Sequence, residues 1–205
     1  MDKLEQEISS LISNVSKDQS IMPYVYLNDD TFDKDKSTVF YSSPYWDKQE
    51  IIQAIKSLLA SKWLVGGERT RLFETQFAEK IGDKYGLLVN SGSSANLIMI
   101  DALKEYFGWN DGDEILTSAV GFPTTLSVIV QNNLKPVFLD IELDSLNIDL
   151  SEIEKKVSDK TVALFLSPVL GNPPDIDELF RLSEKYNFKL ILDGCDSLGT
   201  KWDGK

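Results

Sequence analysis

The sequence predicts an α/β fold in which helices flank a mostly parallel sheet. Short apolar runs that are expected to form strands occur at 87–90, 114–118, 136–140, 162–167 and 189–193. Segments with the apolar periodicity of helices alternate with these runs, at 94–107, 124–133, 151–157 and 175–187. Because strands joined through a helix can cross over and run in the same direction, this alternation favours a parallel sheet.

The part of the chain before the first expected strand is expected to be helical, with one extended segment. Residues 1–20 have the apolar spacing of a short amphipathic helix. Residues 21–46 mix aromatic residues, Asp and Pro without periodicity, and we expect an extended arm packed on another surface such as a partner subunit. Asp47 is expected to cap a helix that breaks at 63–67, and a second helix ends near Gly82. The expected organisation is a helix and aromatic arm at 1–46 and an incomplete α/β domain at 47–205.

The composition restricts the chemistry that is open to the chain. Its 205 residues include 21 Lys and Arg against 33 Asp and Glu, a formal charge of −12. Such a surface repels polyphosphates, so nucleic acid is not an expected partner. The absence of histidine excludes Ser-His-Asp and Cys-His catalysis, and the single cysteine excludes an internal disulfide. No apolar run approaches about 18 residues and no basic leader follows Met1, so we expect a soluble cytoplasmic protein without a membrane partner.

The stretch at 86–96 predicts a strand, a tight turn and the opening turn of a helix. The first N–H groups of a helix have no partner within it, and this end of the helix dipole is positive, so a phosphate is a natural ligand. Gly92 lets the backbone come close to a ligand, and Ser91, Ser93 and Ser94 add hydroxyl donors. A serine N-cap with nothing bound explains the same residues equally well.

Four loops are expected to meet at one edge of the sheet. They lie at 91–94, 118–122, 167–172 and 193–196, and each follows an expected strand. Ligands of parallel α/β sheets bind beyond the carboxyl ends of the strands. The convergence of several loops is a stronger indication of a ligand site than any single motif.

Asp193 and Phe122 are the candidate ligand-binding side chains of this edge. Asp193 ends the last apolar run, where a charged carboxylate is costly unless it meets a cation, such as a protonated pyridine nitrogen. An Asp at a strand end also begins many ordinary turns. Phe122 could stack on a flat ring, although a loop Phe more often covers the core.

A series of motifs resembles one known family, in order and at compatible spacing. The motifs are Trp63–Gly67, Phe73–Ala78, Ser91–Ala95, Gly112–Ile115, Gly121–Thr125, Pro136–Asp140, Leu170–Asn172 and Asp193–Gly199. Together they resemble the fold-type-I pyridoxal-phosphate (PLP) sugar aminotransferases of the DegT/StrS type. The resemblance covers about residues 46–205 and is greatest to the subgroup that contains CDP-4-keto-6-deoxyglucose 3-dehydrase, an enzyme of deoxysugar and O-antigen synthesis. It implies the N-terminal portion of a fold-type-I large domain.

The resemblance implies a site for PLP or pyridoxamine 5′-phosphate (PMP). Ser93 and Ser94, with the amide of Gly92, match the positions that hold the cofactor phosphate. Phe122 matches the aromatic residue that stacks on the pyridine ring. Asp193 matches the carboxylate that pairs with the ring nitrogen and keeps it protonated, so that the ring can accept electrons.

Other matching positions concern specificity and assembly. Asp196 stands where sugar aminotransferases carry Gln and the dehydrase subgroup carries Asp, near the 3-hydroxyl of the ring. Gly66 and Gly67 match a loop that reaches the neighbouring subunit's substrate site, which implies a homodimer and a nucleotide-sugar substrate. Cys195 matches a position that in the dehydrase could ligate a [2Fe–2S] cluster. Such a cluster normally needs four thiolates, so its other ligands would lie beyond residue 205, and a single Cys is usually only a small apolar residue.

The resemblance also implies a longer protein than these 205 residues. Family members continue with a segment that carries the Schiff-base Lys, or a His in the dehydrase subgroup, and then with a small C-terminal domain. We therefore expect a fragment of a PLP- or PMP-dependent enzyme that acts on a nucleotide-linked keto-deoxysugar, inactive by itself. Asp196 and the loop at 121–125 favour 3-dehydration over transamination.

Two other interpretations stay open at this point. The chain could be a catalytically inactive truncated remnant, or one half of a split enzyme that assembles with a separately encoded remainder. It could also be an unrelated doubly wound nucleotide-binding domain, which would bind adenine nucleotides instead of PMP.

Overall fold

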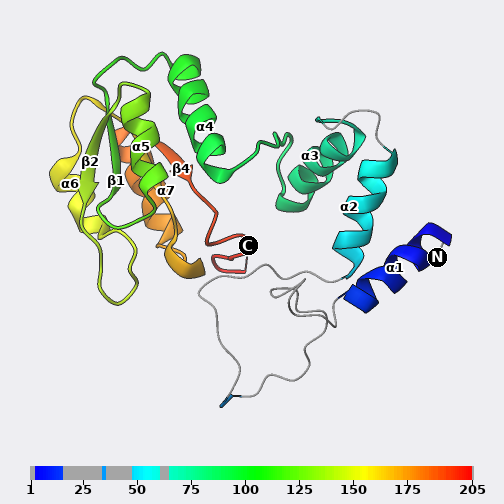
Figure 1. Cartoon of the computed structure of the whole chain (residues 1–205). Helices are drawn as coiled ribbons and strands as arrows, with labels where there is room; N and C mark the ends of the chain where they lie inside the picture. The colour runs from blue at the N-terminus through cyan, green and yellow to red at the C-terminus, as the bar shows by residue number, and fades with distance from the viewer. Residues whose placement is uncertain (1–2, 16–33, 36–47, 61–64, 205) are drawn as a thin grey trace. The chain divides into compact units, whose positions relative to one another are not determined.

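The computed structural model describes residues 3–15, 34–35, 48–60 and 65–204. The chain divides into two compact units, of which the first ends at Gly86 and the second begins at Leu87 (Figure 1). The aromatic arm predicted at 21–46 lies outside the described residues, except for a turn at 34–35, and so does the predicted cap Asp47. The predicted domain boundary after residue 46 stays a prediction.

The first unit is helical in its described part. Its helices are α1 (Lys3–Val15), α2 (Lys48–Ala60) and α3 (Glu68–Ile81). Helices α1 and α2 pack through the buried side chains of Ile8, Ile12 and Ile52. Helix α3 ends at Gly82, whose φ of 83° is left-handed, so the predicted glycine terminus is confirmed.

The second unit alternates helices and strands as the sequence predicted. In chain order it contains α4 (Gly92–Phe107), β1 (Glu114–Ser118), α5 (Pro123–Gln131), β2 (Lys135–Leu139), the 3₁₀ turn η1 (Leu150–Glu152), α6 (Ile153–Lys156), β3 (Thr161–Leu166), the 3₁₀ turn η2 (Val169–Gly171), α7 (Ile176–Tyr186) and β4 (Lys189–Leu192). The four described strands form one sheet in the order β2-β1-β3-β4, and all neighbouring pairs are parallel. Pro136 lies in the edge strand β2, where its missing N–H does not break the interior of the sheet.

Helices cover both faces of this sheet (Figure 1). On one face, Ile115 of β1 and Phe165 of β3 pack with Ile100 of α4 and Ile129 of α5. On the other face, side chains of alternate parity pack with α6 and α7, and they include Leu116, Leu164, Ile153, Leu179 and Leu182. The two-residue periodicity of the strands therefore supplies two core clusters, one for each face.

The strand predicted at 87–90 is wrong for the described structure. These residues have no regular secondary structure, and Leu87 is 72% exposed. A strand forms by pairing, and the described sheet has β2 and β4 at its edges, so no strand of this sheet runs beside 87–90. An apolar run alone does not determine whether a pairing partner is present.

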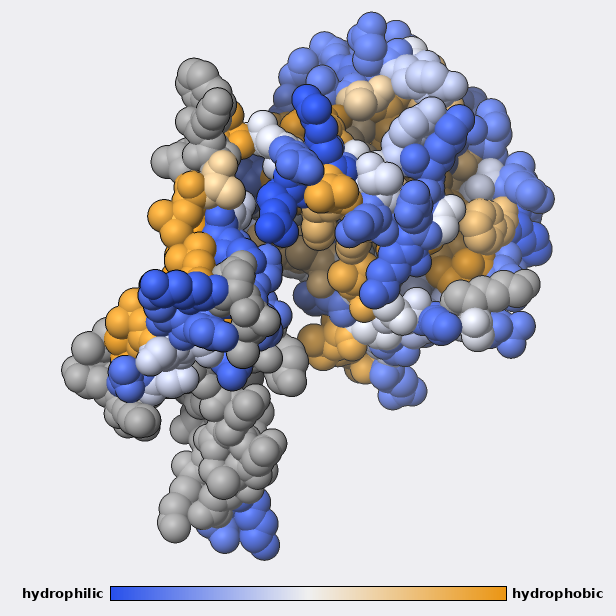
Figure 2. Space-filling model, turned by 90° about the vertical axis from the view of Figure 1, so that its right-hand side faces the viewer, coloured by the Kyte–Doolittle hydropathy of each residue, from blue (hydrophilic) through white to orange (hydrophobic). Residues whose placement is uncertain are grey.

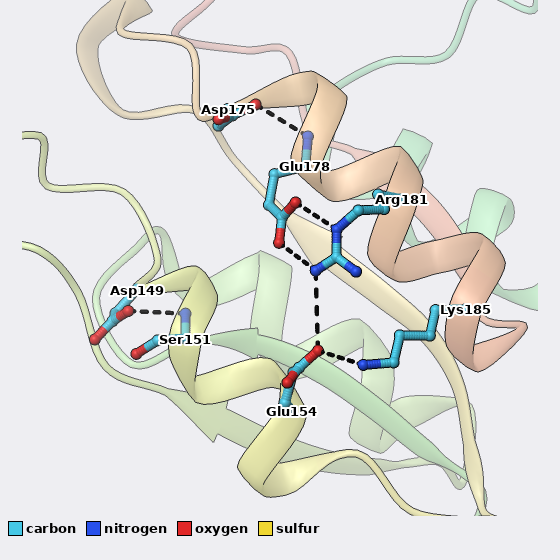
Figure 3. A network of polar contacts seen from close by, with 7 residues as sticks. All are labelled: Asp149, Ser151, Glu154, Asp175, Glu178, Arg181 and Lys185. Carbon is cyan, nitrogen blue, oxygen red and sulfur yellow. Dashed lines mark hydrogen bonds and ion pairs between the residues drawn. The ribbon is translucent and has the colours of Figure 1, made fainter.

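Charged side chains join α6 and α7 on the second face of the sheet (Figure 3). The Arg181 guanidinium donates to both carboxylate oxygens of Glu178 at 2.6 Å, and Lys185 Nζ lies 2.8 Å from Glu154 Oε1. The hydrogen bond from Lys185 lowers the pKa of the Glu154 carboxyl, and Arg181 similarly lowers that of Glu178. Since these side chains are exposed, the network contributes little to the stability of the fold.

Hydrophobic residues also reach the surface of the chain. Figure 2 shows them as orange areas between hydrophilic residues. In the second unit, Leu97, Ile98 and Leu192 are exposed and belong to neither core cluster. The predicted helix at 94–107 is thus confirmed, but part of its apolar pattern does not face the core.

Candidate functional site

Asp193 lies at the centre of the candidate site, directly after β4. Its Oδ2 accepts a hydrogen bond from Asn96 Nδ2 of α4 at 2.8 Å and a longer one from Thr125 Oγ1 of α5 at 3.4 Å. Its Oδ1 accepts from the backbone N–H of Cys195 at 3.1 Å, which is an Asx turn. Asp193 therefore begins a turn, as one interpretation predicted, and in addition joins two helices to the end of the sheet.

The start of α4 lies beside the same turn. A Cβ on Gly92 would lie 3.4 Å from Cys195 Sγ, so the first residue of the helix and the loop after β4 are neighbours. The Ser91 hydroxyl accepts from the Ser94 N–H at 3.2 Å and lies 3.2 Å from the Ser94 hydroxyl, which confirms the predicted serine N-cap. The amides of Gly92 and Ser93 and the Ser93 hydroxyl have no hydrogen-bond partner among the described residues. These groups are therefore available to an anion.

Phe122 directly precedes α5, on the loop that follows β1. It occupies the N-cap position of α5, and the residue is 67% exposed. Within the described structure the ring does not cover the core, so that interpretation of Phe122 is wrong. Because Thr125 of the same helix reaches Asp193, the exposed ring lies on an element that borders the site.

The loop at 167–172, which follows β3, lies against the loop that follows β4. Thr200 Oγ1 donates to the carbonyl of Gly171 at 3.0 Å, so this loop contacts the loop after β4. Leu170 and Gly171 have positive φ angles of 52° and 78°, and the buried amide of Asn147 donates to Asn172 O at 3.0 Å. The loops after β3 and β4 thus meet at the carboxyl ends of these strands, as predicted, and the start of α4 joins them although no strand of the described sheet precedes it.

Asp196 and Cys195 are exposed within this loop. The Asp196 carboxylate makes no hydrogen bond to any described residue and is free to meet a ligand. Among the described residues, no three His, Cys, Asp or Glu side chains are grouped so that they could hold a metal ion. The described structure therefore offers no support for a cluster at Cys195.

Gly66 and Gly67 belong to the first unit, where Gly67 precedes α3 in an extended conformation. Their predicted contact with a substrate in a neighbouring subunit stays a prediction. None of the helices in the described ranges is both long and apolar enough to cross a membrane.

Sequence reasoning missed Asn96 and Thr125. Both side chains are buried, at 5% and 6% exposure, and both donate to Asp193. A signal for Asn96 was present, because it precedes the fully buried Ile100 by four residues and thus lies on the same helix face. A polar residue on a buried helix face needs a partner, and here that partner is 97 residues away in the sequence.

The carboxylate of Asp193 and the open start of α4 lie at the carboxyl ends of a parallel α/β sheet, and fold-type-I PLP-dependent enzymes have this fold. The sequence profile of the DegT/DnrJ/EryC1/StrS aminotransferase family matches residues 46–205, and the chain belongs to this family. The alternative of an unrelated nucleotide-binding domain is therefore wrong.

Relatives of the chain include enzymes that act on nucleotide-linked sugars. Over 147 residues the chain is 42% identical to the lipopolysaccharide biosynthesis protein RfbH of Salmonella typhimurium, covering 70% of the chain and 34% of RfbH. Over 168 residues it is 39% identical to GDP-4-keto-6-deoxy-D-mannose 3-dehydratase of Escherichia coli O55:H7, covering 80% of the chain and 42% of the enzyme. The chain thus spans less than half the length of these relatives.

Solved structures agree with this fold. A crystal structure of GDP-4-keto-6-deoxymannose-3-dehydratase with a trapped PLP-glutamate geminal diamine superimposes with a TM-score of 0.76 at 38% identity. The superposition covers 82% of this chain and 44% of that enzyme. The fold-type-I assignment predicted from the sequence is confirmed.

Proposed function

We propose that the chain forms the cofactor-binding part of a PLP- or PMP-dependent enzyme that removes the 3-hydroxyl of a nucleotide-linked 4-keto-6-deoxysugar. The observation that carries this proposal is the hydrogen bond between Asn96 and Asp193, because it brings the start of α4 and the carboxylate after β4 into one site. The dehydratase relatives and Asp196 favour dehydration over transamination.

The residues of the site fit a cofactor that has a phosphate at one end and a cationic ring nitrogen at the other. The free amides of Gly92 and Ser93 and the hydroxyls of Ser93 and Ser94 would hold the phosphate at the positive end of α4. Asp193 would meet the ring nitrogen, and the exposed ring of Phe122 would stack on the pyridine. When bound, the cofactor would supply an electron sink, because its ring accepts the electron pair of a bond that breaks at the substituent on C4′.

The contribution of this chain is binding and electrostatics. An ionised Asp193 stabilises positive charge on the ring nitrogen and so preserves the ring as an electron acceptor. Asp196 would contact the 3-hydroxyl of the cofactor from the same loop. The group that moves a proton at C4′, a Lys or His in this family, would come from a segment that is not among these 205 residues.

Asp193→Asn tests the proposal in the protein that contains this chain. The neutral amide carries no charge to balance a cationic ring nitrogen, so we expect PMP affinity to fall about ten- to hundredfold, as replacement of a charged hydrogen-bond acceptor by a neutral one implies. Equilibrium dialysis gives the affinity. Mass spectrometry of a GDP- or dTDP-linked 4-keto-6-deoxysugar after reaction gives the chemistry, since dehydration removes the 3-hydroxyl and transamination adds an amine at C4.

The matched control is Asp159→Asn, which removes an exposed carboxylate from the turn before β3, at the other end of the sheet. Its PMP affinity should equal that of the unsubstituted protein. Unchanged affinity in Asp193→Asn would reject the assigned role of Asp193. Formation of an amino sugar would instead assign the chain to the transaminase branch.

Two further assignments belong to the same proposal. We propose that the protein is a homodimer in which Gly66 and Gly67 approach the substrate of the other subunit, and sedimentation of the protein with and without a Gly66→Glu substitution tests this. A [2Fe–2S] cluster at Cys195 needs ligands from outside this chain, and visible absorption of the protein purified without oxygen tests that assignment.

A further inference from the structure

The hydrogen bonds of Asp193 distinguish its two carboxylate oxygens. An ionised carboxylate has two acceptor positions on each oxygen. Asn96 and Thr125 both donate to Oδ2, whereas among the described residues Oδ1 receives only the N–H of Cys195. Oδ2 is therefore filled by the protein, and one acceptor position of Oδ1 stays open.

The two side chains that fill Oδ2 come from separate helices and are both buried. Asn96 is 5% exposed and Thr125 is 6% exposed, and they lie 97 and 68 residues before Asp193. The Asx turn with Cys195 would form without either of them, because it is local to the loop. The long-range bonds thus do something that the turn does not: they oppose rotation of the carboxylate about its terminal torsion, which is broad for Asp.

We propose that Asn96 and Thr125 are positioning residues that hold the Asp193 carboxylate by Oδ2 and leave the open position of Oδ1 for the ring nitrogen of the cofactor. This inference rests on the proposed function, because it assigns the ring nitrogen to Asp193. It adds two residues that act through Asp193 and do not touch the cofactor. Asn96, with the shorter bond of 2.8 Å, is the stronger of the two.

The test follows protonation of the ring nitrogen in PMP bound to the protein that contains this chain, by its absorption as the pH is varied. Asn96→Leu removes the amide donor at nearly constant volume. We expect the apparent pKa of the ring nitrogen to fall by about one unit, which is a tenfold loss of preference for the charged ring. Thr125→Val removes the hydroxyl at constant shape and should shift this pKa in the same direction by less, since its bond is 3.4 Å long. Asp196 is unchanged in every variant, so its charge does not contribute to the differences.

The matched control is Asn132→Leu at the far end of α5. Asn132 is also buried, and its Nδ2 donates to Val128 O at 2.8 Å. Both Asn132→Leu and Asn96→Leu should lower the thermal stability of the protein. Asn132→Leu should leave the apparent pKa of the ring nitrogen unchanged. If the role of Asn96 is merely structural, the apparent pKa of the ring nitrogen should be the same in the two variants. If Asn96 is a positioning residue, this pKa should shift only in Asn96→Leu.

A second measurement needs no cofactor. In the free protein, Asn96→Leu and Asp193→Leu should be non-additive in their effect on the unfolding midpoint, because each removes the same hydrogen bond.

The outcomes separate this inference from the proposed function. If Asn96→Leu fails to fold, Thr125→Val still carries the test. The positioning role alone is overturned if the apparent pKa of the ring nitrogen is unchanged in Asn96→Leu and Thr125→Val but shifts in Asp193→Asn. A shift of this pKa in Asn132→Leu equal to that in Asn96→Leu overturns the positioning role as well. No shift in Asp193→Asn rejects the proposed function itself.

Discussion

Gly92 is a residue at which folding and ligand binding make different demands. A methyl group there would lie 3.4 Å from Cys195 Sγ, an ordinary van der Waals contact, so folding tolerates a larger residue. The same methyl group would stand beside the amides that are open at the start of α4. Under the proposed function, Gly92 matters for the approach of the cofactor phosphate more than for the fold.

Gly92→Ala is expected to change the free energy of unfolding by less than about 0.5 kcal/mol, as surface substitutions usually do. Its affinity for PMP should fall about tenfold, because a bulkier residue keeps the phosphate from the amides. Thermal unfolding and equilibrium dialysis measure the two effects. An affinity equal to that of the unsubstituted protein would show that the phosphate binds elsewhere.

Gly86 presents the opposite case. A Cβ there would lie 2.6 Å from the carbonyl oxygen of Glu74 in α3, too close for any backbone to accept without moving. Gly86→Ala should therefore lower the free energy of unfolding by about 1–3 kcal/mol, as other overpacking substitutions do. Urea unfolding measures this, with Gly66→Ala as a control in the same unit, because its nearest neighbour would be 3.9 Å away. Equal stability of the two variants would contradict the close contact.

At the scale of elements, the two ends of β1 have different roles. The carboxyl end leads into the loop of the site, whereas Glu114 begins the strand at the opposite edge. Glu114 is 8% exposed, and its carboxylate accepts from Lys135 Nζ at 2.7 Å and from Ser158 Oγ at 2.6 Å. It therefore ties β1 to its neighbour β2 and to the turn before β3.

Acid should weaken this tie. The hydrogen bonds from Lys135 and then Ser158 lower the pKa of Glu114 below its ordinary value of 4.5. A carboxyl with a lowered pKa stabilises the folded state above its unfolded pKa, and this contribution is lost as the pH falls through the folded pKa. Glu114→Gln should cost about 1 kcal/mol at pH 7 and less at about pH 3. Urea unfolding at the two pH values measures the difference, and an equal cost at both would contradict an ionised Glu114 pair.

At the scale of the whole molecule, the absence of histidine has a measurable consequence. Histidine is the side chain whose ordinary pKa lies between about pH 5 and 8, so this chain has little to titrate in that range. The ordinary pKa values of Asp, Glu, Lys and Arg lie outside that range, and these residues account for the formal charge of −12. The pH response of the cofactor-free chain near neutrality should therefore be small.

We expect the free energy of unfolding of the cofactor-free chain to be nearly constant between about pH 6 and 7.5, because the folded and unfolded states bind equal numbers of protons there. Chemical unfolding at several pH values measures this. A clear slope would reveal a group with a strongly shifted pKa. If the free energy of unfolding depends on pH only in the presence of PMP, the titrating group is on the cofactor.

The order and type of the elements in the second unit could be predicted because they depend on local periodicity. The strand expected at 136–140 is Lys135–Leu139, and the helix expected at 175–187 is Ile176–Tyr186. The segment at 87–90 has the same apolar character and forms no strand in the described structure. Whether an apolar segment becomes a strand depends on a partner that local sequence does not specify.

By itself, the sequence determined the α/β alternation and the edge of the sheet at which the loops lie, because these follow from residue type and spacing. Only the tertiary structure decided that Asn96 and Thr125 hold Asp193 and that Phe122 is exposed. The physical reason is that a hydrogen bond between residues 97 positions apart depends on how two helices pack against the end of a sheet. No local sequence pattern specifies a contact between residues so far apart in the chain.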